Sequence, residues 1–208
     1  MNDRSDWIPL FTLNTVLFPD GILPLKVFEP RYLDMVRDCM KERVPFGVVL
    51  IRAGQEIGIA ADPETVGCLA HIIDWDAQQL GVLLLRTQGG RRFRIIETRT
   101  RPNKLLEARI DLMPADEPLR IMDRHTACAR TLGLIIEDIN MRGRDELGED
   151  FESPFPDRLK LEDAGWVANR WSEILPIPLK ARQRLLELQD VPARLAIVHE
   201  YLLQHHIL

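Results

Sequence analysis

Residues 7–36 read WIPLFTLNTVLFPDGILPLKVFEPRYLDMV, and the start of the fold is encoded in this stretch. Two apolar segments rich in β-forming residues, 7–13 and 23–28, flank a Pro-Asp-Gly sequence at 19–21 that predicts a turn. We therefore expect a pair of strands. Pro30 suits the first position of a helix, because its missing N–H has no intrahelical partner there. Apolar residues then recur at the helical period and predict one buried face, formed by Tyr32, Met35, Val36, Cys39 and Met40.

Further strands are expected as far as residue 112. The apolar runs 45–51 and 66–73 have the length of central strands. Segments 81–87 and 91–98 flank Gln88-Gly89-Gly90, where glycine permits the positive φ of a tight turn and predicts a β-hairpin. Apolar and charged residues alternate over 106–112, which is typical of a half-exposed strand. About six strands with one helix predict a small closed or nearly closed sheet.

The character of the sequence changes near residue 115. Strand patterns stop, and apolar residues repeat at helical spacing over 118–140, 159–175, 179–188 and 192–204. Asp190 is placed to cap the last of these helices. Residues 142–157 are polar, acidic and broken by Gly and Pro, which predicts a loop. We expect an α+β protein with a β-rich domain at 1–115 and an all-helical bundle at 116–208.

Composition narrows the class of function. The chain has 208 residues and a formal net charge of −5, which opposes general binding of nucleic acid because phosphate neutralisation needs a cationic surface. No apolar run reaches the roughly 18 residues that a membrane span requires. Three widely spaced cysteines give neither a disulfide framework nor a zinc knuckle, so we expect a cytoplasmic protein with no membrane segment.

Motifs for catalysis, metals and cofactors are absent from the sequence. No lysine is followed by Ser or Thr as in a phosphate-binding loop, no serine lies in a GxSxG turn, and no HExxH is present. The cysteines fall on expected apolar faces, where burial raises the thiol pKa and reduces reactivity. We therefore expect no catalytic residue, no metal site and no cofactor.

One cationic cluster stands out between residues 91 and 104. Strand alternation places Arg92 and Arg94 on one face and Phe93 in the core. With Arg99 and Arg101, these arginines are a candidate RNA-contacting edge. The favoured alternative is a solvated strand edge whose charges oppose aggregation, so binding of nucleic acid is not the leading expectation.

Residues 7–36 also closely resemble the N-terminal substrate-binding domain of the ATP-dependent protease Lon. The resemblance continues in order through FGVVL at 46–50, VGCLA at 66–70, GGRRFRI at 89–95 and LPIPLKARQRLLE at 175–187, and then through 190–203, so it covers nearly the whole chain. It implies a PUA-like β pseudo-barrel followed by a helical bundle. Glu29 to Tyr32 match the most recognisable family stretch and are expected to build the strand-to-helix junction, with Arg31 pairing to Glu29 or another carboxylate.

The resemblance implies a protein that binds polypeptide segments and catalyses no reaction. In Lon this domain helps to recognise unfolded or tagged protein segments, whereas separate ATPase and protease domains cut them. The chain up to Leu208 contains no Walker motif, so we expect a free-standing, non-catalytic peptide-binding module. Its partners would be such segments and a protease or chaperone, in an adaptor role in protein quality control, with the oligomeric state open. Because binding unfolded chains needs accessible apolar surface, the expected site lies near Phe11, Phe18 and Phe28, with Arg92 and Arg94 as further candidates.

Overall fold

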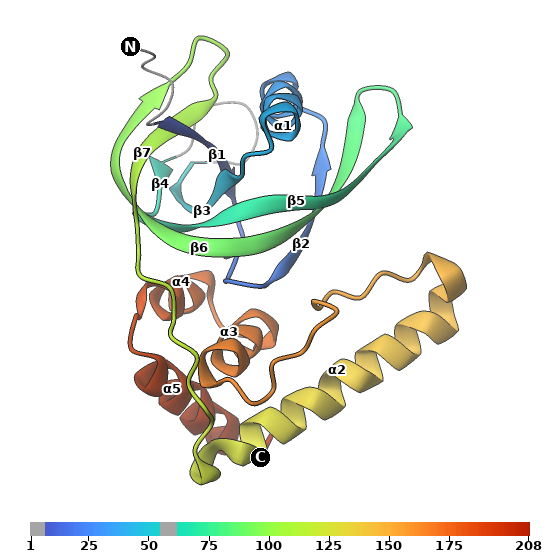
Figure 1. Ribbon diagram of the computed structural model, residues 1–208, viewed down its shortest axis with the longest axis vertical. Coiled ribbons are helices and arrows are strands. Elements are labelled where there is room, and N and C mark those ends of the chain that lie inside the picture. Colours follow the sequence, from blue (N-terminus) through green and yellow to red (C-terminus); the bar gives the residue numbers. More distant parts are fainter. Residues whose placement is uncertain (1–6, 55–61) are drawn as a thin grey trace. The chain divides into compact units, whose positions relative to one another are not determined.

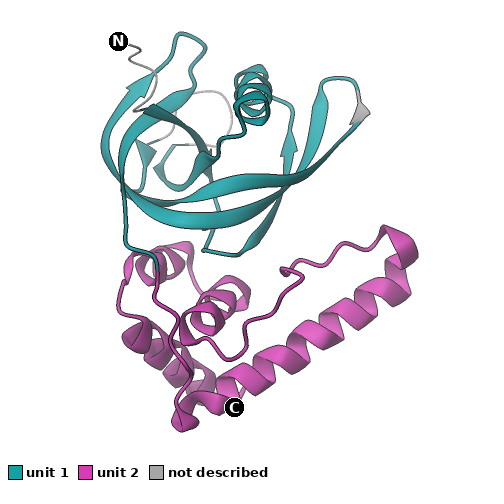
Figure 2. Ribbon diagram, in the orientation of Figure 1, with its two compact units in different colours: residues 1–115 teal, residues 116–208 magenta. Residues whose placement is uncertain are grey.

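The computed structural model describes residues 7–54 and 62–208, and the chain divides into two compact units (Figure 2). The first unit, 1–115, holds the strands and one helix, and the second, 116–208, holds the other helices found in the described residues. The expected α+β class is confirmed. Whether each unit folds independently as a domain stays a prediction.

A ring of strands forms the first unit (Figure 1). Neighbouring strands pair in the order β1, β7, β6, β5, β3, and a parallel pairing of β1 with β3 closes the ring. Short β4 pairs with β3, and β2 pairs with β6. The predicted closed sheet is therefore confirmed. The strands are β1 (Trp7–Leu13), β2 (Ile22–Val27), β3 (Phe46–Ala53), β4 (Asp62–Pro63), β5 (Val66–Gln79), β6 (Val82–Thr100) and β7 (Leu106–Leu112).

Phe93 is fully buried in an apolar cluster to which all strands of the ring contribute. A methyl group added at Gly47 would lie 2.7 Å from the Phe93 ring, and one added at Gly67 would lie 2.6 Å from it. Only glycine at both positions leaves room for this ring. The FGVVL, VGCLA and GGRRFRI segments thus meet at one packing contact, and Phe93 lies in the core as predicted.

Helix α1 (Pro30–Glu42) packs on the other face of β1, β3 and β5. Its buried residues include Tyr32, Met35, Val36 and Cys39, so the predicted apolar face is confirmed. The Tyr32 ring stacks on Phe11 at a centroid distance of 4.0 Å. Arg31 pairs with Glu29 at 3.1 Å, as expected for the strand-to-helix junction.

The predicted hairpin at residues 88–90 is wrong. β6 runs unbroken from Val82 to Thr100, and the hairpin turn lies earlier, between β5 and β6. The glycines do not form a turn but let another part of the backbone approach β6 closely. A methyl group on Gly89 would lie 2.0 Å from the carbonyl oxygen of Phe18. Gly89 and the 20–21 turn are joined by two backbone hydrogen bonds of 2.8 Å.

The predicted pairing of the first two strands is also wrong. The turn at 18–21 does form, with a hydrogen bond of 3.0 Å from the Gly21 N–H to the Phe18 carbonyl. However, the turn is held against Gly89, so the chain continues along β6 and not back along β1. β2 is therefore a neighbour of β6.

Helices make up the second unit, but the helix predicted from 118 begins at Thr126 and the one predicted from 159 begins at Ala164. α2 begins later than expected because the 119–121 backbone instead bonds to residues 162–164, with a bridge between Arg120 and Asp163. α2 also runs through part of the expected 142–157 loop. The helices are α2 (Thr126–Leu147), α3 (Ala164–Ile174), α4 (Leu179–Glu187) and α5 (Val191–Gln204), with 3₁₀ turns at Asp123–His125 and Gly148–Asp150.

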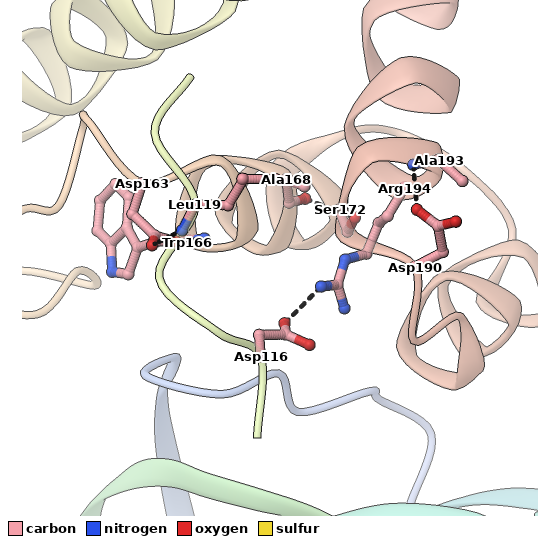
Figure 3. A network of polar contacts seen from close by, with 9 residues as sticks. All are labelled: Asp116, Leu119, Asp163, Trp166, Ala168, Ser172, Asp190, Ala193 and Arg194. Atoms are coloured by element: carbon pink, nitrogen blue, oxygen red, sulfur yellow. Dashed lines mark hydrogen bonds and ion pairs between the residues drawn. The ribbon is translucent and has the colours of Figure 1, made fainter. Parts of the chain in front are cut away.

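Asp116 and Asp163 hold the start of this unit to its helices, and Asp190 caps a helix locally (Figure 3). Asp163 accepts hydrogen bonds from the N–H groups of Leu119 and Trp166, at 3.1 and 2.7 Å, and so caps α3. Asp190 caps α5 through the Ala193 N–H at 2.9 Å, as predicted. The carboxylate of Asp116 accepts a hydrogen bond from Arg194, whose side chain is fully buried.

Candidate functional site

A groove of about 810 Å³ opens in the first unit beside the C-terminal half of α1. We call it the α1 groove. Its walls come from α1, the start of β1, the 44–45 connection, β7, the connection between β6 and β7, and single residues of β5 and β6. The lining residues are Trp7, Ile8, Pro9, Met35, Asp38, Cys39, Glu42, Val44, Pro45, Leu69, Ile96, Arg101, Leu105, Arg109, Ile110, Asp111 and Leu112.

A second groove, of about 390 Å³, adjoins the first and shares Cys39 and Val44 with it. Its other residues are Met40, Arg43 and the β5 segment from His71 to Trp75. Five large apolar side chains that are 45–52% exposed line the two grooves, namely Val44, Ile73, Trp75, Ile96 and Leu112. Apolar surface concentrated in this way is typical of a site that binds another molecule.

Two β-bulges direct isoleucines into these grooves. Ile72 pairs with Thr87 and Asp74 with Arg86, which leaves Ile73 as an extra residue in β5. In the same way Ile96 is extra in β6, between Ile95 and Glu97. A bulge turns a side chain out of the regular alternation, and bulges occur often beside functional sites. The exposure of both isoleucines therefore follows from the register of the sheet.

A buried ion-pair cluster supports the β7 side of the α1 groove. Glu107 is 2% exposed and accepts hydrogen bonds from Arg99, at 2.9 Å, and Arg101, at 2.5 Å. Burial opposes ionisation of the carboxyl, but the bonds from Arg101 and Arg99 outweigh it, and the pKa of Glu107 is lowered. The Arg99 guanidinium also lies 4.2 Å from the centre of the Trp7 ring. These contacts fix Trp7 and Arg101 at the edge of the groove.

The three phenylalanines proposed from the sequence do not form one surface. Phe11 and Phe18 are 7% and 0% exposed, so the prediction of accessible rings at these positions is wrong. Phe11 is covered by Tyr32, and Phe18 lies in the turn that closes over Gly89. Phe28 is 49% exposed, at the connection between β2 and α1, but it lines neither groove.

The arginines of the predicted basic edge have separate environments. Arg92 is 2% exposed, which corrects the prediction that it points outward with Arg94. It lies in the middle of the continuous β6, opposite Cys68 and next to the chain that leaves β7, and not beside a turn. Arg94 is exposed, whereas Arg99 and Arg101 are held by Glu107. The four residues therefore do not form the continuous cationic edge expected for contact with RNA.

The cysteines are buried, and two thiols have strongly raised pKa values. Burial is the main cause, and it raises the pKa of Cys39 to about 12 and that of Cys128 to about 11. The expected burial and raised pKa of these two thiols are confirmed, and their low reactivity follows from them as a prediction. Within residues 7–54 and 62–208, no group of three or more His, Cys, Asp or Glu side chains is arranged to hold a metal ion. No helix in the described part of the chain is long and apolar enough to cross a bilayer.

Sequence reasoning missed the groove, although a signal was present. In a strand with alternating faces, two adjacent isoleucines cannot both point inward. Ile72-Ile73 and Ile95-Ile96 are such doublets, and in each the second member is half exposed. Leu112, in contrast, occupies a position of β7 where the alternation predicts an inward-facing side chain. Its 47% exposure could therefore not be recognised from the pattern.

Comparison with known proteins identifies the family. A family model for the ATP-dependent protease La (LON) substrate-binding domain matches residues 7–204. Lon protease 2 of Myxococcus xanthus is 27% identical over 203 residues, covering 96% of this chain and 24% of that protein. Lon protease of Anaeromyxobacter dehalogenans (strain 2CP-C) is 26% identical over 202 residues, covering 94% and 23%. The chain thus spans about a quarter of the length of these relatives.

Solved structures agree with the family match. The crystal structure of a Lon N-terminal domain protein from Xanthomonas campestris has 32% sequence identity and a TM-score of 0.73, covering 94% of this chain and 98% of that chain. The N-terminal domain of the Mycobacterium avium complex Lon protease has a TM-score of 0.58 at 16% identity, a likeness of fold alone, covering 94% and 97%. The motifs, the fold and these matches lead to one conclusion: the chain belongs to the Lon substrate-binding domain family.

Proposed function

We propose that this protein binds extended, unfolded polypeptide segments in the α1 groove and its adjoining groove. The observation that carries the proposal is the gathering of five half-exposed apolar side chains in two connected grooves. Membership of a protease substrate-binding domain family supports a protein ligand. The volume of about 810 Å³ lies in the range of roughly 300–1,000 Å³ that is typical of pockets burying a drug-sized group.

Binding would follow from apolar burial. A leucine or phenylalanine side chain that moves from water into the groove gains roughly 1.5–3 kcal/mol, so two or three anchors supply roughly 3–9 kcal/mol to offset the entropic cost of association and of ordering the segment. A folded protein keeps such side chains inside, whereas an unfolded one exposes them. The groove would thus distinguish unfolded from folded chains without any chemical step.

The test uses a fluorescently labelled, permanently unfolded polypeptide, such as a reduced and alkylated small protein. This protein is titrated into it, and binding is monitored by fluorescence anisotropy. Ile96→Asp and Leu112→Asp are expected to weaken binding at least tenfold, because each places a charge against the apolar ligand. Leu80→Asp is the matched control, since Leu80 is fully exposed and lines neither groove. Equal affinity of all three variants and the unchanged protein would reject the α1 groove as the site.

The biological setting is a further part of this proposal. We expect a non-catalytic role as an adaptor for a protease or chaperone in the cytoplasm, motivated by the family and by three buried cysteines that form no disulfide within the described residues. Phe28 and Arg94 keep exposed side chains and remain candidates for contacts with such a partner. In-cell crosslinking followed by mass spectrometry tests this role. Recovery of RNA-processing factors in place of proteases or chaperones would contradict it.

A further inference from the structure

Two carboxylates stand on the face of α1 that lines the α1 groove. Asp38 and Glu42 are one helical turn apart, at i and i+4, and both side chains are exposed beside the buried Cys39. Like charges at this spacing destabilise a helix. Both also lie in the C-terminal half of α1, where the negative end of the helix dipole disfavours carboxylates. The pair therefore weakens the helix that carries it, which is a common mark of a functional position.

The two arginines that line the α1 groove form ion pairs with carboxylates other than Asp38 and Glu42. Arg101 is paired with Glu107, and Arg109 is paired with Glu97 at 3.2 Å. In contrast, neither Asp38 nor Glu42 forms an ion pair with any residue in the described part of the chain. The groove thus presents negative charge that its own arginines leave uncompensated.

The pKa of the Cys39 thiol, in the wall of the groove, is affected by the same two carboxylates. Its pKa is raised first by burial and then by the charges of Asp38 and Glu42, against a smaller opposite effect of Arg101. The third carboxylate of the groove, Asp111, lies opposite Arg94 in the register of β6 and β7, so its charge has a cationic neighbour. The negative character therefore centres on the α1 pair.

We propose that Asp38 and Glu42 make the groove selective for apolar polypeptide segments that carry lysine or arginine beside their apolar residues. The inference rests on the proposed function and adds the class of segment that is preferred. A cationic side chain at the rim would face two carboxylates, while the neighbouring apolar side chain enters between Ile96 and Leu112. Complementary charge of this kind supplies specificity more than affinity.

The experiment compares two fluorescein-labelled peptides that share one apolar core and differ only in lysine or glutamate flanks. At low ionic strength we expect the lysine-flanked peptide to bind roughly fivefold tighter, as two exposed charge pairs allow. The difference should shrink in about 1 M salt, where the screening length falls to roughly 3 Å. Asp38→Asn/Glu42→Gln should abolish the difference, whereas the control Glu149→Gln/Asp150→Asn, which removes two exposed carboxylates from the other unit, should retain it.

A thermal melt adds a readout that does not depend on binding. The Asp38→Asn/Glu42→Gln variant should melt at a higher temperature than the unchanged protein, because it relieves the repulsion within α1. An unchanged or lower melting temperature would contradict the strain assigned to the pair.

The outcomes separate this inference from the proposed function. Equal binding of both peptides, or a lysine preference that survives in Asp38→Asn/Glu42→Gln, overturns the inference and leaves peptide binding intact. Failure of both peptides to bind removes the proposed function and the inference with it. The groove could instead be occupied by a second copy of the chain, which sedimentation of the protein alone tests. If the protein is a dimer and Ile96→Asp dissociates it, the groove is assigned to the second copy and the proposal is overturned.

Discussion

Removing the carboxylate of Asp116 should destabilise the helical unit far more than removing an exposed one. The Arg194 side chain is 0% exposed and that of Asp116 is 16% exposed. Two further nitrogens of Arg194, Nε and Nη1, have no hydrogen-bond partner within the described residues. Asp116→Asn keeps the shape of the side chain but leaves the buried guanidinium without its counter-charge. Breaking a buried pair in this way costs about 3–5 kcal/mol.

The assay is urea denaturation followed by circular dichroism, supported by a thermal melt. For a chain of this size a loss of about 3 kcal/mol corresponds to a fall of about 6–12 °C in the melting temperature. Asp138→Asn is the control, because Asp138 forms an exposed pair with Arg142 on α2 and such pairs contribute at most about 1 kcal/mol. Asp116→Leu/Arg194→Met, which removes both charges, should recover most of the loss. A cost for Asp116→Asn as small as that for Asp138→Asn would refute this account of the pair.

Three other perturbations test the packing and electrostatics. Gly67→Ala should lower the free energy of unfolding by about 2 kcal/mol or more, since the added methyl would lie 2.5 Å from the Val48 carbonyl oxygen; urea midpoints check this, with Gly47→Ala expected to behave alike because of Phe93. The pKa of His125 is lowered by burial, His199 and Arg124, so the free energy of unfolding should be highest above about pH 6.5 and should decline below it, where the unfolded state binds the proton first. As the pH falls, the urea midpoint of His125→Gln should drop less than that of the unchanged protein. Parallel pH dependences of the two midpoints would contradict the assignment. The Cys39 thiol, with its pKa near 12, should react slowly with a disulfide reagent at pH 8 until urea unfolds the chain; rapid labelling of Cys39 in the native protein, read by peptide mapping, would disprove its burial.

Elements whose signals lie within their own residues were predictable. α1 begins at Pro30 and buries the predicted face, and α5 is capped by Asp190 as the sequence indicates. Strand β7 has the bounds that its alternating pattern predicts, Leu106–Leu112, although Glu107 is buried and Leu112 is exposed against the alternation. In each case the propensity, the cap or the alternation is a local property, so no distant segment is needed to decide it.

Partners of the strands were not predictable, because pairing depends on contacts between residues far apart in sequence. Gly89 and Gly90 have the local mark of a turn, yet they lie within β6. Gly89 meets the 18–21 turn, and Gly90 meets the side chain of His71. A glycine that permits a turn and one that permits a close approach look the same in a sequence.

The amino-acid sequence alone determined the α+β class, the family and the positions of α1, α5 and most strands, because these follow from local periodicity and from recognisable motifs. Tertiary structure decided which apolar residues remain accessible. Phe11 and Phe18 are covered by Tyr32 and by the turn over Gly89, whereas two bulges turn Ile73 and Ile96 toward solvent. Exposure depends on what packs above a residue, and that is settled only when distant segments meet.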